Sequence, residues 1–230
     1  MCGIAGFIGF PKNIEYAEQA NEIQKHRGPD SQAVWSNEFL SFAHQRLSII
    51  DLSNRSDQPL VKNEFIIVYN GEVYNYEELK EKHLSDVNFK TDSDTEVVLE
   101  MYKRYAEKAL DYFVGMFSFV IYNEKENKIF GARDHFGIKP FYFYHKGNQF
   151  AFASELKTLA KLLPHKKIIN KKALISSLNY LWIPGNESIF EEFNKLPPAH
   201  YFNLDISSSE IEFHKYWNLP TAIHKKTEKE

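Results

Sequence analysis

The sequence predicts an α+β domain in which antiparallel sheets are covered by helices. β-branched and aromatic runs alternate with short polar turns, and helical segments cluster between groups of these runs. Apolar residues make up 43% of the 230 residues, which is enough to form a sizeable core. Strands joined by short turns favour antiparallel pairing.

In the first half of the chain, the opening residues Met1–Gly9 predict a buried strand, because they are small and apolar with glycines where backbones approach closely. Further strands are predicted at 32–36, 39–44, 46–50, 64–69 and 87–91, and helices at 14–25, 76–84 and 94–105. Capping boxes that begin at Asn75 and Ser93 open the last two helices. Asn70-Gly71, directly after the strand at 64–69, predicts a tight turn.

In the second half, alternating strand and turn signals predict hairpins. Strands are expected at 116–123, 127–133, 139–145, 148–153, 200–204 and 210–217. Helical segments are expected at 107–113, 155–162 and 170–181, the last capped by Asn170. From about residue 219 the chain is rich in Lys and Glu, which is typical of a linker or a frayed end.

Composition and charge exclude several functional classes. The formal net charge is −3 with both signs mixed, so neither nucleic acid nor a membrane surface is an expected partner. No apolar segment approaches the length of a membrane span, and the short glycine-broken start is not a signal peptide. One cysteine leaves no internal disulfide and favours a reducing compartment, so we expect the protein in the cytoplasm.

Cys2 is the only cysteine, and it lies one peptide bond from the start of the chain. Removal of Met1 would leave a thiol and a free α-amine on the same residue. Such an amine can act as the base for its own nucleophile, with a pKa of roughly 7.7–8.0. The alternative is an incidental small apolar residue near a terminus.

Four polar clusters follow predicted strand ends or open a helix, at Arg27–Asp30, His44–Ser48, Asn70–Glu72 and Asp94. Arg46 is either a solvated edge residue or a fork that grips a carboxylate. The side-chain amide of Asn70 and the backbone N–H of Gly71 could stabilise an oxyanion, or they could form a plain hairpin turn. Asp94 is either a first-turn carboxylate that the helix dipole stabilises or, with Glu72, a group that holds a ligand ammonium. Arg27–Asp30 is either a simple turn or part of a site rim.

Motifs for metals and phosphates are absent from the sequence. It has no paired-cysteine or HExxH spacing, and no GxxxxGK[ST] or GxGxxG loop. The nine histidines are scattered and are expected to be structural. We therefore expect no metal and no cofactor in this domain.

Nine motifs together resemble one family. They are Cys2-Gly-Ile-Ala-Gly, His26-Arg-Gly-Pro-Asp30, Arg46-Leu-Ser-Ile-Ile-Asp51, Tyr69-Asn-Gly-Glu-Val-Tyr-Asn75, Thr91-Asp-Ser-Asp-Thr-Glu96, Gly115-Met-Phe-Ser-Phe119, Ala132-Arg-Asp134, Phe136-Gly-Ile-Lys-Pro-Phe-Tyr142 and Ala153-Ser-Glu-Leu-Lys157. The chain resembles the glutaminase domain of glutamine-hydrolysing asparagine synthetases of the B type, which are class II glutamine amidotransferases and ligases of amino-acid biosynthesis. The resemblance covers 2–217 and implies a four-layer α/β/β/α sandwich with the N-terminal-nucleophile hydrolase fold.

The resemblance also implies a role for each matching residue. Cys2 would attack the side-chain amide of L-glutamine to form a thioester and release ammonia, with Asn70 and Gly71 as the oxyanion hole. Arg46 would bind the α-carboxylate of the substrate, and Asp94 with Glu72 would bind its α-ammonium. Backbone groups of the segment Leu47, Ser48, Ile49 and Ile50 would complete the pocket.

Two positions depart from the family's pattern, and a second domain is expected beyond this one. Pro197-Pro198-Ala199 stands where Pro-Pro-Gly is usual, and His135 where arginine is common. The family's synthetase domain, which uses ATP and Mg²⁺, carries a Ser-Gly-Gly-x-Asp-Ser loop that these residues lack. We expect 218–230 to be a linker or the start of that domain, and the chain to be a fragment or truncated product.

Three alternatives stay open at this stage. The ammonia could serve an acceptor other than aspartate, because acceptor choice lies in the second domain. The domain could also be a catalytically silent module kept for binding or regulation. A homodimer is a third open point, since nothing in the sequence fixes the oligomeric state.

Overall fold

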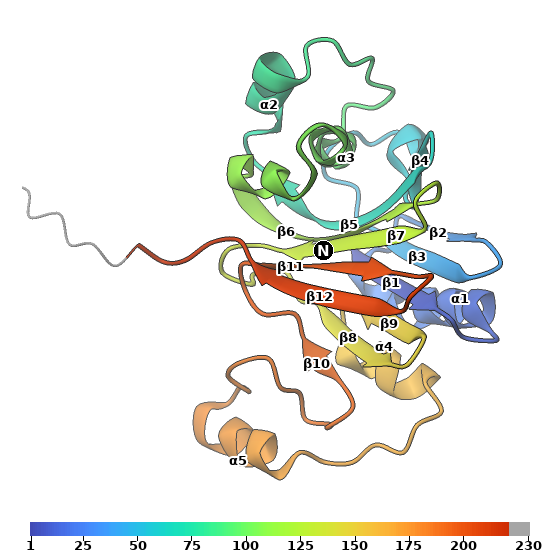
Figure 1. Ribbon diagram of the computed structural model, residues 1–230, viewed down its shortest axis with the longest axis vertical. Helices are drawn as coiled ribbons and strands as arrows, with labels where there is room; N and C mark the ends of the chain where they lie inside the picture. The colour runs from blue at the N-terminus through green and yellow to red at the C-terminus, as the bar shows by residue number, and fades with distance from the viewer. Residues whose placement is uncertain (221–230) are drawn as a thin grey trace, which may run out of the picture.

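The computed structural model describes residues 1–220 and consists of two stacked antiparallel sheets between helices (Figure 1). The first sheet has the strand order β10 (Asn194–Lys195), β8 (Tyr142–Lys146), β9 (Gln149–Ala153), β1 (Gly3–Ile8), β3 (Leu40–Arg46) and β2 (Ser31–Ser36). The second has the order β12 (Glu210–Lys215), β11 (His200–Asp205), β7 (Lys128–Arg133), β6 (Gly115–Asn123), β5 (Phe65–Val73) and β4 (Leu60–Lys62). The prediction of helix-covered antiparallel sheets is confirmed.

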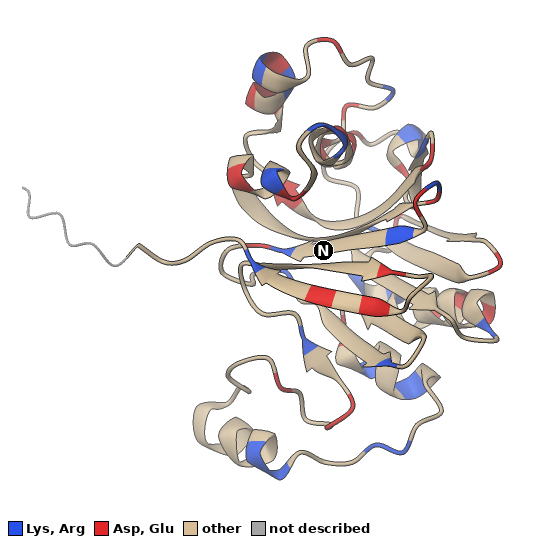
Figure 2. Cartoon of the chain, in the orientation of Figure 1, with Lys and Arg blue, Asp and Glu red and all other residues tan. Residues whose placement is uncertain are grey.

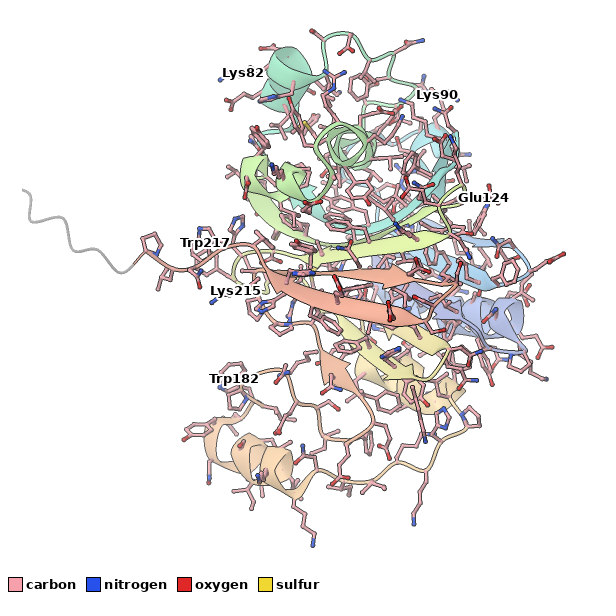
Figure 3. The ribbon with its side chains drawn as sticks, viewed as in Figure 1. Lys82, Lys90, Glu124, Trp182, Lys215 and Trp217 are labelled. Carbon is pink, nitrogen blue, oxygen red and sulfur yellow. The ribbon has the colours of Figure 1, made fainter. Side chains whose placement is uncertain are left out.

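Five α-helices and three short 3₁₀ segments connect the strands of the described chain. They are α1 (Asn13–Gln24), α2 (Tyr76–His83), α3 (Asp94–Tyr105), α4 (Leu156–Leu162) and α5 (Lys171–Tyr180), with η1 (Lys25–Arg27), η2 (Asn54–Ser56) and η3 (Ala106–Tyr112). Helix α5 stands apart from the sandwich (Figure 1). The loop after it carries the exposed Trp182, and Trp217 belongs to the segment that leaves β12 (Figure 3). Among the described residues, no helix is long and apolar enough to cross a membrane.

Three apolar cores separate the four layers. The central core lies between the sheets and joins residues of β1 and β3 such as Ile4 and Phe42 to residues of β5 and β6 such as Val68 and Val120. A second core lies between the β5–β6 face and helices α2 and α3. The third packs α1 and α4 on the β1–β9 face. Successive residues of a strand face opposite sides of the sheet, and β1 and β5 each have a core on both sides. Both faces of these strands are therefore buried, which accounts for their continuous apolar runs.

Most predicted elements are confirmed within one to three residues, but five local predictions are wrong. No strand forms at 46–50 or 87–91, because β3 ends at Arg46 and neither segment finds a partner strand. Asn70-Gly71 is not a turn; β5 continues through it and pairs with β6 up to Val73. The Asn75 side chain does not cap α2 but bonds the backbone of Tyr112 and Val114.

The fifth correction concerns the second capping box. Ser93 does cap α3 and accepts a hydrogen bond from the Thr95 N–H at 3.2 Å. Glu96 does not return to Ser93; its carboxylate accepts from the N–H groups of Lys90 and Thr91 and pairs with Lys62 at 2.6 Å. The ion pair with Lys62 and the bonds to the loop before α3 therefore replace the predicted bond from Glu96 to Ser93.

In the view of Figure 2, basic and acidic residues are interspersed over the described elements. Ala199, where the family usually has glycine, has φ 58°, in the left-handed region that glycine adopts without steric cost. His135 stacks edge-on against Tyr216 and Trp217, and so helps to anchor the segment after β12. The predicted linker at 218–230 lies mostly outside the described residues.

His44 generates a pH-dependence prediction. It is fully buried on β3, its Nε2 lies 3.2 Å from the Tyr69 carbonyl oxygen, and burial lowers the pKa of its imidazole to about 4. Between pH 6.5 and 4 the unfolded chain binds a proton that the folded chain does not. Stability therefore falls with falling pH in this window, by about 2 kcal/mol between pH 7 and 4.5.

The measurement is urea unfolding of the native chain and of His44→Gln at both pH values. The neutral glutamine should remove about 2 kcal/mol from the pH-dependent loss, because it binds no proton in either state. Equal losses in the two proteins would contradict the prediction.

Candidate active site

A cavity of about 230 Å³ opens where the start of β1, the loop after β3 and the end of β5 meet. Its lining includes Cys2, Arg46, Asn70, Asp94 and Lys139. This volume is below the roughly 300–1,000 Å³ of pockets for drug-sized ligands, so the cavity suits a small metabolite.

Cys2 is held directly before β1, which lies between β3 and β9 in its sheet. The Leu47 N–H donates to the Cys2 Sγ at 3.4 Å, and the Arg27 Nε–H donates to the Cys2 carbonyl oxygen at 3.0 Å. Burial raises the pKa of the Cys2 thiol, whereas the hydrogen bond with Leu47 and the charges of the N-terminal amine, Lys139 and Arg46 lower it. The thiol is thus held in a fixed position, with cations among the groups that line its cavity.

Asn70 brings an unpartnered amide to the same cavity. The residue is 1% exposed, and neither its Nδ2 nor its Oδ1 has a hydrogen-bond partner among the described residues. Leaving a buried amide unpaired costs on the order of 1–3 kcal/mol. A bound ligand that accepts from Nδ2 would recover part of this cost.

The backbone N–H of Gly71 points to the edge of β5 that no strand covers. Pairing with β4 stops at Ile67, and beyond it the N–H groups of Tyr69 and Val73 donate to side chains, to Gln58 Oε1 at 2.6 Å and to Asp94 Oδ2 at 3.0 Å. Alternate residues of a strand point their N–H groups to the same edge. The Gly71 N–H therefore lies between these two bonds, with no acceptor of its own in the described chain.

Gly71 also has a steric reason to be glycine. A Cβ at this position would lie 2.6 Å from the Met116 carbonyl oxygen and 2.8 Å from the Phe117 backbone. The close approach of β5 and β6 at this pair therefore requires a residue without a side chain. The glycine that suggested a turn in the sequence is needed here for strand packing.

Arg46 ends β3 and is almost fully buried. Its Nη1 donates to the Ser53 carbonyl oxygen at 2.9 Å and to Asp57 Oδ1 at 2.7 Å, and its Nη2 donates to the Asp51 carbonyl oxygen. Guanidinium has five N–H donors, so two remain without a partner in residues 1–220. Arg46 is thus anchored by part of its donors and can offer the rest to a ligand anion.

Asp94 opens α3 at the opposite wall of the cavity. Its Oδ2 accepts from the Tyr69 hydroxyl at 2.7 Å and from the Val73 N–H. Burial raises the pKa of Asp94, while these two hydrogen bonds lower it. No basic side chain of the described chain pairs with it. Glu72, half-buried, also lines the cavity.

The loop after β3 contributes Leu47, Ile49 and Ile50 to the lining, but not Ser48. The Ser48 N–H donates instead to Asp30 Oδ2 at 2.7 Å. Arg27 does not pair with Asp30; it donates to Glu155 at 3.1 Å as well as to Cys2. The Arg27–Asp30 segment therefore supports the rim of the cavity, one of the two interpretations that the sequence left open.

The structure adds residues that the sequence analysis did not single out. Gln58 bridges β5 and α3 by donating to Thr95 Oγ1 at 3.1 Å, and Lys139 places an ammonium in the cavity. The signal for Lys139 was a lone charge in the apolar run Phe136–Phe141. Within residues 1–220 no group of three or more His, Cys, Asp or Glu side chains is arranged to hold a metal.

Comparisons with known proteins agree with this geometry. Residues 1–217 match the glutamine amidotransferase domain family. A Methanocaldococcus jannaschii protein, provisionally named asparagine synthetase [glutamine-hydrolyzing] 2, is 38% identical over 96% of this chain and 47% of its own length. Asparagine synthetase [glutamine-hydrolyzing] 3 of Bacillus subtilis is 34% identical over 97% of this chain and 38% of its own. The chain thus spans less than half the length of these relatives.

A solved structure shows the same fold. The glutamine phosphoribosylpyrophosphate amidotransferase of Bacillus subtilis superposes with a TM-score of 0.70 at 16% identity, over 94% of this chain and 49% of that chain. The predicted sandwich of antiparallel sheets between helical layers is confirmed, and its fold is the one found in that amidotransferase.

Asn70 generates a stability prediction. Asn70→Ala removes two buried polar atoms that have no partner, so the free energy of unfolding should stay within about 0.5 kcal/mol of the native value or rise. Gln58→Ala is the matched control, because its amide makes two buried hydrogen bonds and its loss should cost about 1–3 kcal/mol. Urea unfolding of both variants measures the difference, and an equal loss in the two would be evidence against a free Asn70 amide.

Proposed function

We propose that this chain, which belongs to the glutamine amidotransferase domain family, hydrolyses the side-chain amide of L-glutamine with Cys2 as the nucleophile. The observation that carries the proposal is the meeting of the only thiol with the unpartnered Asn70 amide in one cavity. A nucleophile and a free oxyanion donor are the two groups that acyl transfer requires.

The nucleophile depends on the removal of Met1. The free α-amine of Cys2 then takes the thiol proton through an intervening water, and the thiolate attacks the amide carbon. The C–N bond breaks, and the proton passes from the amine to the leaving nitrogen, which departs as ammonia. Water then hydrolyses the thioester and releases glutamate. While Met1 is attached, the nitrogen of Cys2 is an amide and cannot act as a base.

Asn70 and Gly71 form the oxyanion hole in this proposal. The Asn70 Nδ2 and the Gly71 N–H both lack an acceptor among the described residues, and both belong to the end of β5. Donors that are already fixed stabilise the developing oxyanion without reorganising, and the loss of one such donor typically lowers kcat by about 10²–10³.

The two ends of the substrate are held by opposite charges. Arg46 offers its remaining guanidinium donors to the α-carboxylate, and Asp94 with Glu72 accepts the α-ammonium. Leu47, Ile49 and Ile50 line the space between them, and the bond from the Ser48 N–H to Asp30 holds this loop in place. In an amino acid the α-carboxylate and the α-ammonium are bonded to the same carbon. A small cavity with the Arg46 guanidinium and the Asp94 carboxylate matches this arrangement.

For the whole protein we propose that the ammonia amidates aspartate in an ATP- and Mg²⁺-dependent synthetase domain. The names of the longer relatives support this. Residues 2–217 would be the glutaminase domain and 218–230 the junction, in a cytoplasmic protein. Another acceptor is the alternative, because the choice of acceptor would lie in the synthetase domain. A silent module is disfavoured, because Cys2, Arg46, Asn70 and Asp94 are all intact around the cavity.

Cys2→Ala generates the central prediction. Protein that begins at Cys2, as verified by mass analysis, should release glutamate from glutamine, whereas Cys2→Ala should release none above background. Cys2→Ser is the isosteric control; it should fold equally well and lose most of the activity, because a hydroxyl is a weaker nucleophile. Equal activity in Cys2→Ala would exclude the thiol mechanism.

Arg46→Lys tests the carboxylate grip. An ammonium cannot copy a planar two-pronged contact, so KM for glutamine should rise by at least about tenfold, with a smaller change in kcat. Arg55→Lys is the control, because Arg55 is exposed on η2 outside the cavity. An unchanged KM in Arg46→Lys would remove Arg46 from the substrate site.

A further inference from the structure

Lys139 has a buried side chain that lines the cavity, and its ammonium has no partner in residues 1–220. The residue is 4% exposed, yet its ammonium makes no hydrogen bond and no ion pair with any residue of the described chain. A buried charge is costly unless it is paired, so lysines in such positions are rare. Its side chain lines the same cavity as Cys2, Asn70 and Glu72.

The backbone of Lys139 is fixed from both sides. Its N–H donates to Asp134 Oδ2 at 2.9 Å, and its carbonyl oxygen accepts from Arg133 Nε at 2.7 Å. Asp134 is fully buried and also accepts from the N–H groups of Phe117 and Ile138. The turn 134–139 is therefore tied to β6, the strand that pairs with the Asn70–Gly71 segment.

Arg133 closes the turn from the other side. Its guanidinium donates to the carbonyl oxygens of Gly137 and Leu196, in addition to that of Lys139. Arg133 is itself a cation, and Asp134 makes no ion pair with the Lys139 ammonium within residues 1–220, because its carboxylate is engaged by backbone N–H groups. Arg133 and Asp134 thus fix the backbone position of Lys139 without neutralising the charge of its ammonium.

We propose that Lys139 is a positioning residue whose ammonium stabilises the thiolate of Cys2 in the cavity. The role of this interaction in catalysis rests on the proposed function, whereas the interaction itself can be tested without glutaminase activity. The ammonium keeps its proton throughout; the thiol proton goes to the α-amine, and Lys139 stabilises the negative sulfur that remains. No carboxylate pairs with Lys139 in the resting protein, which leaves its charge available to the sulfur.

The other charges around the pair are few. Burial lowers the pKa of the Lys139 ammonium, the negative charges of Cys2, Glu72 and Asp134 raise it, and Arg27 lowers it further. Around the thiol, the remaining cations are the Met1 amine, Arg46 and Arg27, whose Nε donates to the Cys2 carbonyl oxygen and whose Nη1 pairs with Glu155. The Tyr69 hydroxyl is bonded to Asp94. Arg46 is already paired with Asp57 at 2.7 Å, so Lys139 is the side-chain cation near the thiol without a carboxylate partner in residues 1–220.

The test uses the fact that Cys2 is the only cysteine. The rate of Cys2 alkylation by iodoacetamide, measured from pH 6 to 10, gives the thiol pKa without any need for glutaminase activity. Lys139→Met removes the charge at nearly constant length and should raise this pKa by about one unit or more. Lys139→Arg keeps the charge and should raise it by less than half as much.

Lys195→Met is the matched control. Burial also lowers the pKa of the Lys195 ammonium, but this residue lines other cavities and donates to the Ile183 carbonyl oxygen. It should leave the Cys2 alkylation profile unchanged. Thermal midpoints establish that the variants fold, and Lys139→Gln replaces Lys139→Met in the test if the apolar variant does not fold.

An unchanged thiol pKa in the neutral variant would overturn the inference, as would equal shifts in Lys139→Met and Lys139→Arg, which would indicate altered packing instead of lost charge. A shift in alkylation in a protein that releases no glutamate would support the Lys139–Cys2 interaction and refute only the proposed function. In an active protein, the acid limb of the pH profile of kcat/KM should move with the thiol pKa.

Discussion

The uncovered edge of β5 is the constraint on which the site depends. A strand edge leaves backbone N–H groups that need acceptors, and β4 serves this edge only as far as Ile67. Beyond it, Gln58 and Asp94 supply side-chain acceptors to Tyr69 and Val73. These two bonds bring the η2 region and the start of α3 against β5. They also leave the Gly71 N–H between them for a ligand.

The cavity results from two sheets that contribute different kinds of group. The first sheet brings Cys2 at the start of β1 and Arg46 at the end of β3, which are neighbours because β1 and β3 pair antiparallel. The second brings Asn70 and Gly71 from β5. Only the stacking of the sheets through the central core places the thiol opposite the amide. Mutations in that core should therefore affect the site geometry as well as stability.

The charges of Asp94 and Lys139 have no charged partner in residues 1–220, whereas Arg46 is paired with Asp57. Arg46 is anchored by Asp57 and backbone carbonyls but keeps donors in reserve, and Asp94 is held by Tyr69 and a backbone N–H instead of a cation. The turn fixed by Arg133 and Asp134 does the same for Lys139. Such unpaired buried charges are unfavourable for folding and are typical of sites that a charged ligand or intermediate completes.

The sequence by itself determined the element types, because hydrophobic periodicity and capping are local properties. The strand at 64–69, the Ser93 cap of α3 and the Asn170 cap of α5 follow from residues within a few positions of each other. All of the site residues that the family resemblance identified line the cavity except Ser48, whereas Gln58 and Lys139 line it without having been singled out.

Only the tertiary structure decided how strand ends and charges are used. Asn70-Gly71 has the local chemistry of a turn, but pairing with β6 extends the strand through it, because a ladder formed with a distant segment outweighs a local preference. The missing strand at 46–50 has the same cause, the lack of a partner. Which N–H remains free, and which lysine remains unpaired, depends on contacts between residues far apart in the chain, and no local pattern records them.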